Sequence, residues 1–164
     1  MSGAPATDKK PSNRGARRRS RECVVQGLYA WLINYEPSGV QAAGASGVIE
    51  AHLRANDDFA HCDLELFQSL LHGTLDHAVQ LRGVFAQHID RTPKELSPVE
   101  HAMLLLGSYE LLFCLDTPLR VIINEAIEVS KVFGGNDGYK YINGVLDKVA
   151  SKARPVEFAA SRRK

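Results

Sequence analysis

Apolar side chains between residues 64 and 89 recur every three or four positions, and this spacing constrains the fold more than any other feature. It is the period of an amphipathic α-helix with one buried face. The pattern predicts one long helix, bent near Gly73, as the central element of the core. Its inward positions are Leu64, Phe67, Leu71, Leu75, Ala78, Leu81, Phe85 and Ile89.

Five further segments show the same period. The sequence Ser97-Pro98-Val99-Glu100 is typical of a capping box at a helix start, and the pair Gly134-Gly135 is typical of a helix end. No segment alternates polar and apolar residues with a period of two, so the fold class is all-α with about six or seven helices. The further helices are expected from about 17 to 36, 41 to 56 (the weakest pattern), 97 to 115, 117 to 133, and from just after the glycine pair to about 150.

Length and composition bound the class of protein. A chain of 164 residues suits one domain or two small helical halves that share a core. No apolar run is long enough for a membrane span or a signal peptide, which predicts a cytoplasmic protein. The three cysteines, an odd number without a CxxC pair, indicate neither a disulfide framework nor a zinc site.

The net charge of +1 conceals a polarised distribution. Residues 1–21 contain seven basic side chains and one acidic side chain, a net charge of +6. Residues 152–164 contain five basic side chains and one acidic side chain, a net charge of +4, so residues 22–151 carry a net charge of −9. An acidic body repels nucleic acid, so phosphate binding is expected only where the basic ends lie.

Five arginines crowd the beginning of the first expected helix. Electrostatics alone would direct them to RNA, to DNA or to an acidic protein, and a solvated, disordered tail is an equally good interpretation of the run by itself. Because the run continues into an amphipathic helix, part of it is held against the domain. Cations are unfavourable at a helix N-terminus unless an anion neutralises them, and a bound phosphate would do so. The five are Arg14, Arg17, Arg18, Arg19 and Arg21.

Residues 136–144 combine two tyrosines with a lysine and two asparagines at the start of the last expected helix. Aromatic rings stack on unpaired bases, lysine contacts phosphate, and Asn or Asp reads base edges, so the mixture suits single-stranded RNA. The alternative is that the tyrosines pack in the ordinary way and that Asn136 or Asp137 caps the helix.

Catalytic patterns are absent from the sequence. The six histidines form no HxxxH pair, and there is no P-loop, GxGxxG or GxSxG motif. We therefore expect neither an enzyme nor a bound metal or cofactor.

Two long motifs carry a resemblance to a known family. The segment ARRRSRECVVQGLYAW (16–31) resembles the opening of NusB proteins, in which an arginine-rich stretch leads into a helix of the form A-x-Q-x-L-Y. The segments INEAIEVSKVFG (123–134) and KYINGVLDK (140–148) resemble the INEAxExAKxFG and KFxNGVLD blocks of that family. One departure is Tyr141, where the family commonly has Phe.

The resemblance implies two small helical bundles that share a core. It also implies transcription antitermination, through binding of the boxA element of ribosomal RNA leader transcripts jointly with the small-subunit ribosomal protein NusE, within the RNA polymerase antitermination complex. The implied protein-partner residues are Arg91, Glu100 and positions near Leu119. The implied RNA-binding residues are Arg17, Arg18, Arg19, Arg21, Tyr29, Asp137, Lys140 and Tyr141.

The expected organisation is a disordered basic leader over residues 1–15, a NusB-like RNA-binding domain over 16–151 and a basic tail over 152–164. Two alternatives remain. One is a helical adaptor whose arginines contact acidic protein and which is indifferent to RNA sequence. The other is the NusB-like module that begins some RNA cytosine methyltransferases, which continue into a large α/β domain.

Overall fold

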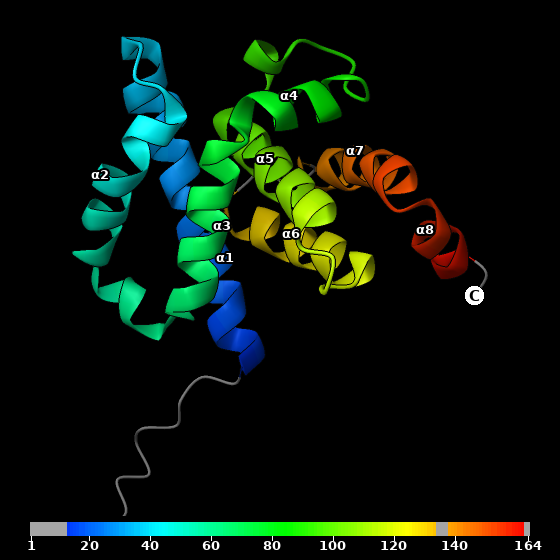
Figure 1. The fold of residues 1–164 in the computed structure, drawn as a ribbon, viewed down its shortest axis with the longest axis horizontal. Helices are drawn as coiled ribbons and strands as arrows, with labels where there is room; N and C mark the ends of the chain where they lie inside the picture. The colour runs from blue at the N-terminus through cyan, green and yellow to red at the C-terminus, as the bar shows by residue number, and fades with distance from the viewer. Residues whose placement is uncertain (1–12, 134–137, 163–164) are drawn as a thin grey trace, which may run out of the picture.

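The computed structural model describes residues 13–133 and 138–162, and all regular structure within these ranges is helical (Figure 1). The all-α prediction is confirmed. Short π-helical and 3₁₀ turns follow α1, and 3₁₀ turns precede α3 and α5. The α-helices are α1 (Asn13–Ala30), α2 (Ala42–Arg54), α3 (Leu64–Asp76), α4 (Ala78–Ala86), α5 (Pro98–Phe113), α6 (Leu119–Phe133), α7 (Gly138–Ala153) and α8 (Pro155–Ser161).

The central element is α5, not the segment at 64–89 that the sequence indicated. It contacts α1 and α3 on one side and α4, α6 and α7 on the other. Every residue from His101 to Ser108 is buried, because α5 is enclosed on all faces. The predicted capping box is present: the Ser97 hydroxyl accepts from the Glu100 amide, and the Glu100 carboxylate accepts from the Ser97 amide, both at 3.1 Å.

The segment at 64–89 forms two helices rather than one bent helix, and the break lies at His77, one turn beyond Gly73. The His77 amide donates to the carbonyls of both Gly73 and Thr74, and its imidazole Nδ1 lies 2.8 Å from the Gly73 oxygen. These contacts use the last carbonyls of α3 and let α4 leave in a new direction. This break, together with α8, gives more helices than the six or seven predicted.

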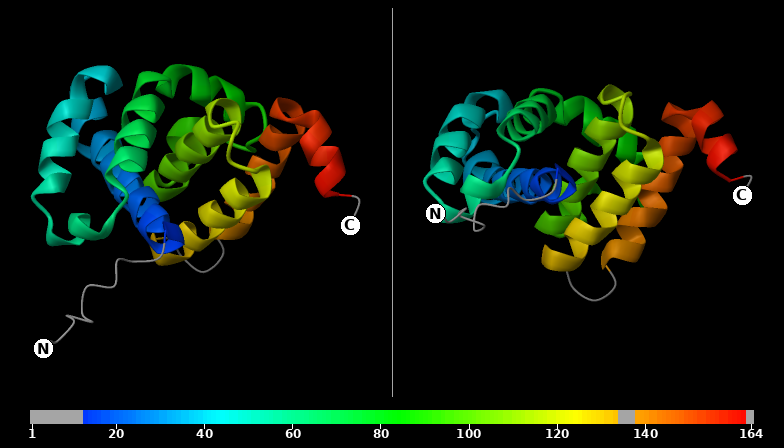
Figure 2. Two further views of the ribbon diagram at one scale, coloured as in Figure 1. Left: turned by 60° about the horizontal axis from the view of Figure 1, so that its bottom comes forward. Right: turned by 90° about the horizontal axis from the view of Figure 1, so that it is seen from below.

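The helices form two groups on either side of α5 (Figures 1 and 2). The first group is α1, α2 and α3, and the second is α6 and α7, with α8 beyond them. Gly107 permits the close approach of α5 and α7, because a Cβ there would lie 2.7 Å from the buried side chain of Leu146. None of the helices in the described ranges is long and apolar enough to cross a membrane.

A buried histidine joins α5 to the turn after α1. The Arg82 guanidinium donates to His101 Nε2 at 2.9 Å and to the carboxylate of Glu36. Burial, and then the positive charge of Arg82, lower the pKa of His101 to about 4. The native protein therefore holds this imidazole neutral.

We expect acid destabilisation from His101. Its pKa in the unfolded chain is about 6.5, so the unfolded state takes up the proton first as the pH falls, and stability is lost between about pH 6.5 and about pH 4. Between about pH 7 and about pH 5 the loss from this residue is about 2 kcal/mol. His101→Gln retains an acceptor for Arg82 but cannot take up this proton. Urea unfolding should therefore show that its free energy of unfolding falls by about 2 kcal/mol less than that of the wild type between about pH 7 and about pH 5. An equal loss in both proteins would contradict the assignment.

Candidate nucleic-acid interface

The first turns of α1 place arginines on the surface beside α6 (Figure 2). Arg14 is exposed, and within the described residues it forms no ion pair. Arg17 lies 4.0 Å from Asp63, and Arg19 pairs with Glu22 at 2.8 Å; about a third of each arginine side chain is exposed. Such partly exposed pairs are weak, so these guanidiniums remain available to an external anion.

Arg18 points to α6 and forms a two-pronged ion pair with Glu125. Its Nε and Nη2 donate to the two carboxylate oxygens at 3.0 and 2.7 Å. The hydrogen bond from Arg18, reinforced by the charges of Arg18 and Arg21, holds the pKa of Glu125 below its usual value against the opposing effect of burial. The buried carboxylate thus neutralises part of the positive charge at the start of α1, where the sequence pointed to an external anion.

Arg21 lies in the interior. Only 3% of the residue is exposed, and its guanidinium donates to both oxygens of Glu110 on α5, at 3.0 and 2.8 Å. In this structure Arg21 connects α1 to α5 and does not reach solvent. Sequence reasoning missed Glu110 and Glu125 as its neighbours. Glu110 follows the apolar Met103 and Leu106 at helical spacing, and a carboxylate on such a buried face requires a cation.

Tyr29 extends the exposed face of α1. It is 42% exposed and follows Arg18 by eleven residues, about three helical turns, so both lie on the same side of the helix. Lys140 is exposed in the first turn of α7. Close by, the Lys131 ammonium lies 5.1 Å from the centre of the Tyr139 ring. The predicted RNA-binding residue Asp137 lies outside the described residues.

Tyr141 contacts the loop that follows α4. Its hydroxyl donates to Asp90 at 3.0 Å, and the guanidinium carbon of Arg91 lies 4.6 Å from the ring centre. The hydrogen bonds from Arg91 and then Tyr141 lower the pKa of Asp90. Two residues that the resemblance placed on different surfaces, Arg91 for the protein partner and Tyr141 for RNA, are therefore in direct contact.

The other two partner residues lie in different settings. Glu100 is half-buried in the capping box of α5. Leu119 begins α6 with its side chain buried, and its amide donates to Glu157 of α8 at 2.7 Å. The next two residues, Arg120 and Val121, are exposed and form the surface at the start of α6.

These features define a class: a small all-helical protein whose first helix presents arginines to solvent at the edge of an otherwise acidic body. The family model described as the NusB family matches residues 18–151. The transcription antitermination protein NusB of Bordetella pertussis is 49% identical over 151 residues, which cover 92% of this chain and 96% of that protein. The chain belongs to the NusB family.

Two solved structures share the fold. NusB of T. maritima is 26% identical, with a TM-score of 0.69 over 87% of this chain and 96% of that one. A structure of the antitermination factors NusB and NusE in complex with dsRNA contains a chain that is 20% identical, with a TM-score of 0.66 over 82% of this chain and 96% of that one. The likeness to that second chain establishes the common architecture.

Proposed function

We propose that this protein is a cytoplasmic transcription antitermination factor that binds boxA-type single-stranded RNA of ribosomal RNA leader transcripts together with the ribosomal protein NusE. The observation that carries the proposal is the cluster of arginines at the start of α1, in which Arg14 is exposed and the side chains of Arg17 and Arg19 are each about a third exposed. Family membership and the names of the relatives support it, because those relatives are called antitermination proteins.

We propose a different role for each group of the predicted RNA-binding residues. Arg17, Arg19 and Lys140 are assigned to phosphates, because the two arginine side chains are about a third exposed and Lys140 is exposed. Arg18 lies at the edge of this surface, where its ion pair with Glu125 holds α1 against α6 and offsets most of its charge. Tyr29 offers an exposed ring for stacking on a base.

Three predicted residues act in other ways. Asp137 reads a base edge, a role that rests on the sequence alone because this residue lies outside the described residues. Tyr141 stacks on a base once Arg91 leaves its ring. Arg21 acts indirectly, because its ion pair with Glu110 fixes the direction of α1.

The test is equilibrium binding of the purified protein to a boxA-type RNA and to a scrambled RNA of the same length, with and without NusE. Selective binding that NusE strengthens is expected. With about four phosphates neutralised, the slope of log affinity against log salt should be about −3, from about −0.7 per phosphate on a single strand. Equal binding of both RNAs under all conditions, with a flat salt response, would favour the adaptor instead.

Glu100→Lys is expected to weaken NusE binding about tenfold or more and to leave RNA binding by the isolated protein within about twofold, because Glu100 lies in the first turn of α5, apart from the arginines that begin α1. Glu100→Gln is the matched control, because its amide oxygen preserves the hydrogen bond to the Ser97 amide. Calorimetry with NusE and fluorescence anisotropy with RNA measure the two affinities. Equal losses in both assays, with circular dichroism unchanged, would contradict this separation of surfaces.

A further inference from the structure

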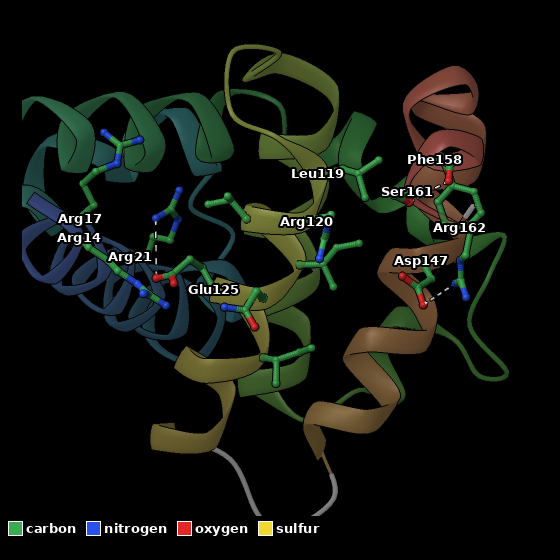
Figure 3. Close-up of a pocket in the computed structure, with 14 residues that line it drawn as sticks. Arg14, Arg17, Arg21, Leu119, Arg120, Glu125, Asp147, Phe158, Ser161 and Arg162 are labelled. Carbon is green, nitrogen blue, oxygen red and sulfur yellow. Dashed lines mark hydrogen bonds and ion pairs between the residues drawn. The ribbon is translucent and has the colours of Figure 1, made fainter. Parts of the chain in front are cut away.

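A groove runs along α6 between the start of α1 and α8 (Figure 3). Its volume is about 1120 Å³. Because its lining extends from the first turns of α1 along α6 to α8, the groove suits an extended occupant better than a compact one. In Figure 3, Arg14 and Arg17 stand at one side of it and Arg162 at the other, with Arg120 between them on α6.

The groove is positively charged. Glu125 on its wall is already neutralised by Arg18 and Arg21. Asp147 is the other carboxylate of the lining, and Arg162 pairs with it at 3.2 Å. Arg120 is exposed, and in the part of the chain that the structure describes it has no ion-pair partner. An occupant of the groove therefore meets a surplus of guanidinium groups, which favours an anion.

The floor carries groups that suit unpaired bases. Val121 is 43% exposed, and the amide side chain of Asn124 is exposed beside it. At the far end, the Arg162 guanidinium lies 4.9 Å from the centre of the Phe158 ring. Apolar side chains and guanidinium planes contact base faces, and an asparagine amide can read a base edge.

We propose that this groove is a second segment of the RNA path, in which single-stranded RNA continues from the arginines of α1 along α6 to α8. Phosphates there are bound by Arg120 and Arg162. The proposal rests on the proposed function, because the groove begins at Arg14 and Arg17. That continuity, together with the exposed amide, favours RNA over an acidic peptide as the occupant. Arg162 and α8 follow the residues that match the family model, so the α8 end of this groove lies outside the matched region, whereas Arg120 and α6 lie within it.

The test uses the full chain and three RNAs: a boxA-type RNA of about 12 nucleotides, and the same RNA lengthened by about six unstructured nucleotides at its 5′ or its 3′ end. The wild type should bind one of the longer RNAs about 5- to 10-fold more tightly than the short one. Arg120→Gln/Arg162→Gln should bind the short RNA as the wild type does and lose this gain. Its salt slope on the longer RNA should fall by about 1.4.

The matched control is Lys148→Gln/Lys152→Gln. It removes two positive charges from the exposed part of α7 that faces His88 rather than the groove, and should keep the gain. Arg120→Gln alone breaks no ion pair among the described residues and should lose about half of the gain in affinity that the longer RNA gives. This single variant replaces the double variant in the test if the double variant is unstable.

Three results would overturn the proposal: no gain from either extension, an undiminished gain in the groove variants, or loss of poly-glutamate binding by these variants with RNA binding intact. The third result would assign the groove to an acidic peptide. Failure of the proposed function is distinguishable, because Arg17→Gln/Arg19→Gln would then leave the binding of all three RNAs unchanged.

Discussion

Replacing Arg154 by alanine lowers the free energy of unfolding by about 3 to 4 kcal/mol, the sum expected for several charge-assisted hydrogen bonds to carbonyls that are left buried. The Arg154 guanidinium lies where α5 ends, and only 7% of the residue is exposed. Its nitrogens donate to the carbonyl oxygens of Glu110, Leu111, Cys114 and Thr117 at 2.7 to 3.1 Å. Two of these carbonyls belong to the last turn of α5 and two to the loop that follows it. Arg154, which stands between α7 and α8, therefore ties the end of α5 to the C-terminal helices.

Urea unfolding monitored by circular dichroism measures this loss. Lys152→Ala is the matched control, because this exposed side chain precedes Arg154 by two residues on α7, and its effect should stay within about 0.5 kcal/mol. Arg154→Lys should recover less than half of the loss, since one ammonium cannot reach four carbonyls. A loss below about 1 kcal/mol in Arg154→Ala would show that water replaces the guanidinium at little cost.

Arg21→Ala is expected to destabilise the fold by about 3 to 5 kcal/mol, because it leaves the buried carboxylate of Glu110 without its cation. Arg19→Ala is the control on the same helix, with an expected effect of about 0.5 kcal/mol, since its pair with Glu22 is partly exposed. The apolar double variant Arg21→Met/Glu110→Met should regain most of the stability, because it buries no unpaired charge.

RNA binding by this double variant also shows whether Arg21 only orients α1 or contacts RNA directly. If Arg21 only orients α1, the folded double variant binds boxA-type RNA within about twofold of the wild type. A loss of about tenfold or more, with stability restored, would show that the Arg21 guanidinium contacts RNA.

Helix positions were predictable from the sequence where a local signal exists. The capping box at Ser97 and the weak helix at 41–56 follow from spacing and cap chemistry, and the structure confirms both. The glycine pair expected to end the 117–133 helix lies outside the described residues. The break at His77 was not predictable, because the apolar period continues across it and only tertiary contact selects two helices. The central position of α5 depends in the same way on which helices surround it.

The candidate site, like the fold, was predictable from the sequence only in part. Periodicity and charge identified the arginine cluster, and family motifs named its residues. Which arginines face solvent was not predictable, because Arg18 and Arg21 find their carboxylates more than eighty residues away in sequence. Arg154 appeared in the sequence as part of a basic tail, although its guanidinium is among the most buried cations of the described chain.

The central claim is that the solvent-accessible arginines at the start of α1 bind RNA phosphates. Its most direct test is the affinity of Arg17→Gln/Arg19→Gln for a boxA-type RNA across a salt series, with Arg54→Gln, an exposed arginine of α2, as control. We expect binding about tenfold weaker or more and a salt slope reduced by about 1.4 in the double variant, with the control unchanged. An unchanged affinity and slope in the double variant would contradict the account.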